Sequence, residues 1–252
     1  MRIPVLLLAY LALALACAAP GGKDGEDDPD RPEADADTDA DTDADADTDT
    51  DTDVDLSPCG VYTSAALVGS EAVHRYTNEE ELGYGGTYTN VTESYDAGTG
   101  EVVFSSETTL DGASYRYYEG SSTSVMRCDD DGLWMESYYA EYAYETTSGY
   151  AGSGWTEAVY EDGYLVMPSS PAVGDRWTAS GTLTYDGSAG PGSLEYAMAY
   201  EVVGAESRTV PAGTFSTLRI AQTTSGDTTE LWVAPDIGTI ETEYAELTRW
   251  TP

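Results

Sequence analysis

The alternation of large apolar or aromatic residues with small or polar ones after Cys59 constrains the fold most. From Leu194 to Val202 every second residue is Leu, Tyr, Met or Val, with Glu or Ala between them. Trp134, Tyr138, Tyr142 and the residues near them follow the same period. A repeat of two residues is typical of strands with one buried face, so these segments predict β-structure.

Turn residues divide this pattern into short segments. They form clusters such as Asp111-Gly112, Asp129 to Gly132, Asp162-Gly163, Asp186-Gly187 and Pro211 to Gly213. Their spacing predicts about ten to thirteen antiparallel strands. The single helical candidate is the short segment Glu79 to Leu82. We therefore predict an all-β domain over residues 58–252, built as one strongly curved antiparallel sheet, either a partial barrel or a sandwich. A second boundary near Ser169 to Pro171 is possible but not required.

The N-terminus has the features of an export signal. Arg2 is followed by an apolar stretch, Val5 to Leu15, that is shorter than the about 20 residues needed to span a bilayer as a helix. We predict a signal peptide over residues 1–16. Ala14 to Cys17 resembles the lipobox of bacterial lipoproteins, which implies lipid attachment at Cys17 and an outer-membrane or cell-surface location. Ordinary cleavage after Ala16 or Ala18, giving a periplasmic or secreted protein, is the alternative.

Residues 17–57 are predicted to form a disordered linker anchored by lipid at Cys17. From Ala34 to Asp55 aspartate alternates with Thr or Ala, and such a segment cannot bury enough apolar surface to fold. The tract lacks the Gly and the later bidentate carboxylate of a calcium loop, so we expect a solvated spacer. It resembles the Asp/Thr spacers of myxobacterial surface lipoproteins.

The cysteine count also agrees with export. With Cys17 assigned to the anchor, Cys59 and Cys128 remain as a pair in the folded part. In an oxidising compartment such a pair is expected to form a disulfide, and two buried thiols are the alternative.

The net negative charge of the chain argues against nucleic acids as partners. The chain carries a net charge of −37 at pH 7, and after Pro58 it has 30 acidic residues but only seven arginines and no lysine. This field repels phosphate, so we expect no nucleic-acid binding. Adaptation to a saline medium and simple solubility of an exported protein both explain the acidity.

Aromatic content indicates binding more than catalysis. Twenty Tyr stand against two Phe, which suits either an aromatic binding face or a sheet with one wet face. The single histidine, His74, is expected to be structural, and no nucleophile, phosphate-loop or metal motif is present. We predict no catalytic residues, no cofactor and no metal site. A hydrolase that uses two carboxylates is the less favoured alternative.

Three segments carry a resemblance to uncharacterised exported bacterial β proteins. They are Val173 to Trp177 (VGDRW), Val210 to Phe215 (VPAGTF) and Trp232 to Gly238 (WVAPDIG). Val233 and Asp236 replace the usual aromatic residue and Gly. The resemblance implies a curved sheet similar in shape to periplasmic lipoprotein-carrier half-barrels that wrap an apolar ligand. We therefore predict a cell-envelope lipoprotein with a non-catalytic binding module for an apolar or glycan ligand. A structural or adhesion protein is the alternative.

Overall fold

The computed structural model describes Cys59 and residues 62–65, 67–77, 79–112 and 114–252. Twelve strands and one short helix follow in the order β1 Glu71–Tyr76, α2 Glu79–Leu82, β2 Gly85–Asp96, β3 Glu101–Asp111, β4 Tyr115–Asp129, β5 Gly132–Thr146, β6 Ala151–Pro168, β7 Arg176–Gly187, β8 Gly192–Val210, β9 Gly213–Thr224, β10 Asp227–Ala234, β11 Gly238–Thr242 and β12 Ala245–Thr251. Among the described residues, no helix combines the length and apolarity needed to cross a membrane.

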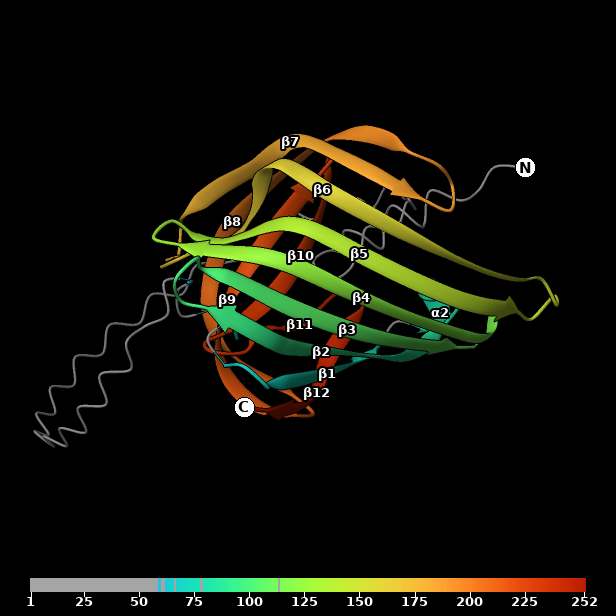
Figure 1. Cartoon of the computed structure of the whole chain (residues 1–252). Helices are drawn as coiled ribbons and strands as arrows, with labels where there is room; N and C mark the ends of the chain where they lie inside the picture. The colour runs from blue at the N-terminus through green and yellow to red at the C-terminus, as the bar shows by residue number, and fades with distance from the viewer. Residues whose placement is uncertain (1–58, 60–61, 66, 78, 113) are drawn as a thin grey trace, which may run out of the picture. The chain divides into compact units, whose positions relative to one another are not determined.

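The twelve strands form one closed antiparallel barrel (Figure 1). Each strand pairs with its neighbours in sequence, and β1 closes the sheet by pairing with β12 from Glu71–Thr251 to Tyr76–Ala245. The prediction of an all-β domain with one curved antiparallel sheet is confirmed, as is the helical segment at Glu79–Leu82. The sheet closes completely instead of forming a half-barrel, because β1 and β12 satisfy each other's edge hydrogen bonds.

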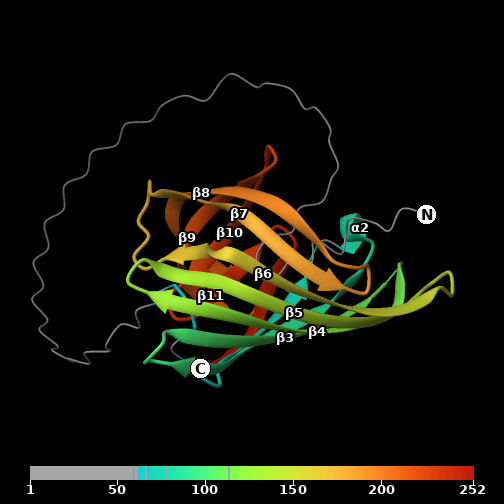
Figure 2. The ribbon, with the colours of Figure 1, turned by 45° about the horizontal axis from the view of Figure 1, so that its top comes forward.

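Strands β4, β5 and β6, with 15, 15 and 18 residues, are long enough to project beyond the rest of the barrel at one end (Figures 1 and 2). The short tip between β5 and β6 includes Tyr150, whose side chain is exposed. We call this projection the arm. Its inner face continues the interior of the barrel, because residues two apart on a strand share a face.

The ladder between β6 and β7 covers only part of both strands. It runs from Thr156–Gly187 to Tyr160–Leu183, whereas β5 pairs with β6 as far as Pro168 and β8 pairs with β7 back to Arg176. The barrel wall is therefore split between the second half of β6 and the first half of β7. Side chains bridge this split, as described below.

The turn from β10 to β11 explains why Asp236 can replace the Gly found in the exported bacterial β proteins that this segment resembles. Asp236 stands where the pattern has Gly, and it adopts a φ of 61°. Positive φ is tolerated by Asp more readily than by most residues, because its short polar side chain can bond locally. The turn therefore keeps the geometry that Gly would give.

Candidate ligand-binding site

The barrel contains a cavity of about 150 Å³ that is partly open to solvent. Side chains from almost the whole circuit of strands line it, because inward positions from distant strands converge at the centre of a closed sheet. The lining residues are Tyr62, Thr63, Ser64, Ala72, His74, Tyr88, Asn90, Val91, Thr92, Phe104, Ser105, Ser106, Ser122, Ser124, Met126, Leu133, Val166, Met167, Trp177, Tyr200, Ile220, Leu231, Val233, Ile237, Gly238, Thr239 and Trp250. A cavity of this volume holds a molecule of about the size of benzene.

The cavity wall has an apolar part and a hydroxyl-bearing part. Ile220 on β9 and Val233 on β10 are fully buried on one side. The hydroxyls of Ser124 and Thr92 are buried on the other. None of the lining residues is Asp, Glu, Lys or Arg. This wall suits an uncharged ligand that is apolar over most of its surface.

Trp177 supplies the most distinctive polar group of the cavity. Its ring stacks on Tyr200 with ring centroids 4.8 Å apart and planes 9° from parallel. The indole Nε1 is buried, and within the described part of the chain it finds no acceptor. A buried N–H without a partner costs about 1–3 kcal/mol.

The VGDRW segment explains why Trp177 is held inside the barrel. The Asp175 carboxylate accepts a hydrogen bond from the Ala172 amide at 2.8 Å, which closes the turn before β7. The Asp175 carbonyl accepts from the Val202 amide at 2.9 Å, which ties the turn to β8. The sequence pattern did not predict the position of Trp177 in the cavity wall.

Tyrosine side chains of β6 and β8 bridge the split between β6 and β7. The hydroxyls of Tyr164 on β6 and Tyr200 on β8 form a hydrogen bond, and Tyr164 also donates to the Met198 sulfur at 3.3 Å. The Tyr196 hydroxyl donates to the Gly163 carbonyl at 3.1 Å. Burial raises the pKa of Tyr200 well above its usual range, so this hydroxyl stays protonated. Side chains thus close the wall where the backbone ladder stops.

His74 is a structural member of the cavity wall. Its Nε2 lies 2.9 Å from the Thr239 carbonyl, so Nε2 carries the proton in the neutral ring. The ring stacks on Tyr88 at 4.5 Å. Burial lowers the pKa of His74 to about 4, against the opposing effect of the Thr239 carbonyl. The ring is therefore neutral at pH 7, as the cavity's uncharged character requires.

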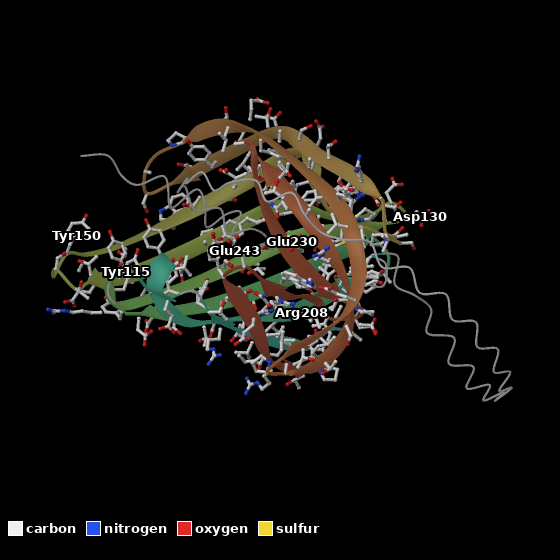
Figure 3. All side chains as sticks on the ribbon, turned by 180° about the vertical axis from the view of Figure 1, so that it is seen from behind. Tyr115, Asp130, Tyr150, Arg208, Glu230 and Glu243 are labelled. Carbon is white, nitrogen blue, oxygen red and sulfur yellow. A yellow bond between two sulfur atoms is a disulfide. The ribbon has the colours of Figure 1, made fainter. Side chains whose placement is uncertain are left out.

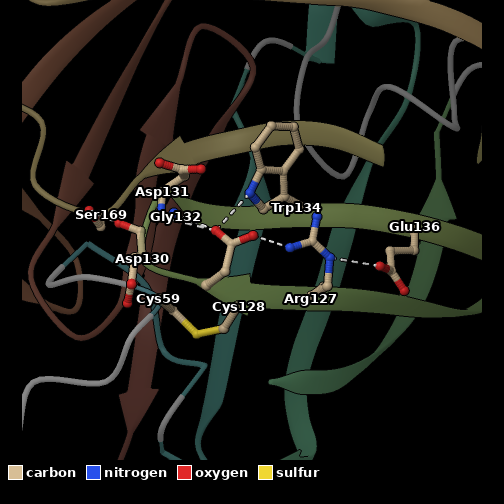
Figure 4. A network of polar contacts seen from close by, with 10 residues as sticks. Cys59, Arg127, Cys128, Asp130, Asp131, Gly132, Trp134, Glu136 and Ser169 are labelled. Atoms are coloured by element: carbon tan, nitrogen blue, oxygen red, sulfur yellow. Dashed lines mark hydrogen bonds and ion pairs between the residues drawn. A yellow bond between two sulfur atoms is a disulfide. The ribbon is translucent and has the colours of Figure 1, made fainter. Parts of the chain in front are cut away.

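The segment before β1 closes one end of the cavity. Tyr62, Thr63 and Ser64 all line it, and Ser64 hydrogen-bonds the Thr92 hydroxyl at 3.2 Å. Cys59 and Cys128 are joined with 4.7 Å between their Cα atoms, a separation suited to a disulfide (Figure 4). This bridge fastens the segment to β4.

The end of β4 that carries Cys128 is fixed by the polar network drawn in Figure 4. The Asp129 carboxylate accepts from Trp134 Nε1 and from the Asp131 amide, each at 3.0 Å, and forms an ion pair with Arg127. Arg127 also donates to Glu136 at 3.0 Å and lies over the Trp134 ring. Partial burial opposes ionisation, but the Trp134 and Arg127 contacts prevail and lower the pKa of Asp129. The turn is thereby held in one conformation.

Within the described part of the chain, no arginine is left unpaired for an anionic partner. Each of the seven arginines after Pro58 forms an ion pair with a carboxylate. Arg208, labelled in Figure 3, binds Glu241 through two hydrogen bonds of 2.5 and 2.6 Å and lies 4.2 Å from the centre of the Trp232 ring. Pairing of this kind leaves no cationic cluster for phosphate.

Several predicted features lie outside the described residues. These are the signal peptide over 1–16, the lipid attachment at Cys17 and the linker over 17–57. They remain predictions. Within the described ranges, no group of three or more His, Cys, Asp or Glu residues is arranged to hold a metal ion.

No protein-family model and no curated protein matches the sequence. Two solved structures have a similar shape. A Bacteroides fragilis protein, described as exported with a YmcC-like fold, is 16% identical over 77% of this chain and 100% of its own, with a TM-score of 0.42. A Parabacteroides distasonis protein, described as a lipoprotein, is 14% identical over 77% and 99%, with a TM-score of 0.41. At this level of similarity neither structure carries an argument about the function of this chain.

Proposed function

We propose that this chain is an exported lipoprotein, anchored through Cys17, whose barrel binds a small uncharged ligand in its cavity without catalysis. The observation that carries the proposal is the cavity of about 150 Å³, whose lining includes Trp177 with its buried, unbonded indole N–H. The ligand class is a compact apolar molecule, or the apolar end of a larger one, with one hydrogen-bond acceptor.

The character of the wall supports binding over hydrolysis. A glycosidase needs two carboxyl groups about 5–10 Å apart in its site, and the cavity lining contains none. The Nε2 of His74 is used by the Thr239 carbonyl, so this nitrogen does not serve a nucleophile. The chemistry available at the cavity is therefore hydrogen bonding and packing.

A matched pair of probes tests whether a hydrogen-bond acceptor on the ligand strengthens binding to the purified full chain. 4-Fluoroacetophenone carries a carbonyl, and 1-ethyl-4-fluorobenzene replaces it by a methylene. We expect saturable ¹⁹F NMR shifts for both, with about tenfold tighter binding of the ketone, because it accepts from Trp177 Nε1. Trp177→Phe keeps a stacking ring without the N–H and should abolish that preference.

A variant that fills the cavity with a larger side chain tests whether the probes bind there. Ser124 is buried in the cavity wall, and Ser121 is exposed on the opposite face of the same strand. Ser124→Leu should weaken both probes at least tenfold, whereas Ser121→Leu should leave them unchanged. If Ser124→Leu does not fold, Ser122→Leu replaces it, because Ser122 also lines the cavity at a less buried position. Equal binding by all variants, or no saturable binding by the unmodified chain, would contradict the proposal.

The anchor is tested separately in cells. We expect incorporation of labelled palmitate into the chain and its loss in Cys17→Ser. Membrane association of the Cys17→Ser variant equal to that of the unmodified chain would count against the anchor, whatever the result for the cavity.

A further inference from the structure

The inner face of the arm carries four tyrosines whose rings form a closed set of contacts. Tyr115 and Tyr118 come from β4, and Tyr142 and Tyr144 from β5. The ring centroids lie 5.8 Å apart for 115–118, 6.3 Å for 118–142, 6.1 Å for 142–144 and 6.1 Å for 115–144. We call this set the tyrosine platform. None of the four rings lines the cavity, so the platform is a separate site.

Three of these rings are almost parallel and stacked on one another in pairs. The planes of Tyr118 and Tyr142 differ by 4°, and those of Tyr142 and Tyr144 by 22°. Each ring leans over a glycine on the adjacent strand or its own. A methyl group added at Gly154 would stand 2.5 Å from the Tyr142 hydroxyl, and one at Gly152 3.0 Å from that of Tyr144. The glycines thus allow the rings to lie across the sheet.

Charge is segregated between the two faces of the arm. The register places Glu107 on β3, Glu119 on β4 and Glu141 on β5 at outward positions. The inward positions of β3, β4, β5 and the first half of β6, all within the described residues, hold Tyr, Phe, Leu, Val, Met, Cys, Ala, Gly, Ser and Thr, with no charged residue. Figure 3 shows Tyr115 and Tyr150 at the arm.

We infer that the tyrosine platform binds a neutral glycan chain. A pyranose ring has a face of C–H groups and a rim of hydroxyls, which complements a flat aromatic surface bordered by Tyr, Ser and Thr hydroxyls. Adjacent parallel rings can contact successive sugars. An acidic glycan is repelled by the chain's strongly negative field, whereas a neutral one is not.

The residue types distinguish a glycan from an aliphatic chain as the occupant. All four rings are Tyr, not Phe, and the inward positions near them on β3 and β4 include Thr108, followed toward the barrel by Ser106 and Ser122 of the cavity lining. These groups keep their hydrogen bonds in contact with a hydrated, hydroxyl-rich ligand but lose them against methylenes. Burial raises the pKa of each of the four phenols, so all remain protonated donors.

The test is affinity electrophoresis of the full chain in gels containing dextran, mannan or barley β-glucan, with polygalacturonate as the acidic probe. We expect at least one neutral polysaccharide to retard the chain and polygalacturonate to have no effect. Tyr142→Ala and Tyr144→Ala should reduce the apparent affinity at least tenfold. If the alanine variants do not fold, the test uses Tyr142→Leu and Tyr144→Leu, which keep apolar volume without a flat ring. They should show the same loss of affinity.

The controls use tyrosines on the opposite face of the same strands. Tyr117 on β4 and Tyr139 on β5 are both 42% exposed, so Tyr117→Ala and Tyr139→Ala should be retarded like the unmodified chain. No retardation by any neutral polysaccharide, equal loss in the control variants, or stronger retardation by polygalacturonate would overturn the inference. Binding of 4-fluoroacetophenone should persist in Tyr142→Leu, which separates this result from that of the cavity.

Discussion

At the scale of single residues, the direction in which a side chain points decides its chemistry. Tyr138 is buried inside the barrel, whereas its neighbour Tyr139 is 42% exposed and stacks on Trp155 outside. His74 shows the same dependence, because its strand position places the ring in the cavity wall.

His74 should make stability depend on pH. Its folded-state pKa of about 4 lies below the unfolded value of 6.5, so between these values the unfolded chain binds the extra proton. Stability is therefore full above pH 6.5 and is lost as pH falls toward 4, by about 3 kcal/mol. Urea unfolding at pH 7.5 and pH 4 should show this loss.

The control for this prediction is His74→Gln, whose amide can still donate to the Thr239 carbonyl but does not titrate. Its free energy of unfolding should fall by about 3 kcal/mol less over the same pH interval. The NMR titration of the His74 ring protons gives the pKa directly, and a midpoint near 6.5 would refute the assignment.

At the scale of elements, the incomplete pairing of β6 with β7 sets the local stability of the wall. Residues 183–185 of β7 pair with β6 on one side and β8 on the other, whereas residues 176–182 pair only with β8. The Tyr164–Tyr200 hydrogen bond spans this region but does not replace a ladder.

Hydrogen exchange should therefore differ within this one strand. Amides of Trp177 to Ser180, taken together, should exchange about tenfold faster than those of Leu183 to Tyr185, because unpaired backbone opens at lower cost. Tyr164→Phe should increase this difference further. Uniform protection along β7, measured by mass spectrometry on short peptides, would show that the wall is closed throughout.

At the scale of the whole molecule, the excess of acidic residues acts as self-repulsion. After Pro58 there are 30 acids and seven arginines, and the arginines are already paired. With the carboxylates of β3 to β5 directed outward, most of the repulsion acts through solvent, where salt screens it.

Salt should therefore stabilise the folded chain. Between 20 mM and 300 mM NaCl we expect the melting midpoint to rise by roughly 2–4 °C, or about 1 kcal/mol, with little change toward 1 M. This plateau identifies charge screening, since effects on water structure grow steadily with concentration. A midpoint that is constant or falls would show that ion pairs outweigh the repulsion, and would favour solubility over adaptation to salt.

Much of the architecture is predictable from local pattern. The period of two and the Asp-Gly turns predict the strands and their antiparallel order, because each depends only on neighbours in sequence. The cavity is not predictable in this way. Trp177 and Tyr200 belong to strands that the pattern identifies, but nothing local shows that their rings meet Phe104 and Ser124 from the other side of the barrel. Small hydroxyl residues at inward positions, such as Ser122 and Ser124, are the available signal of an unfilled interior.

The sequence by itself determined the β-strands and the acidity of the chain, since these follow from composition and short-range spacing, and it predicted the cysteine pair and the export signal. Only the tertiary structure decided that the sheet closes, that it leaves a cavity with an unbonded indole N–H, and that four tyrosines meet on one face of the arm. The physical reason is that closure and side-chain convergence depend on β1 meeting β12 and on the register of every ladder between them, which no single segment encodes.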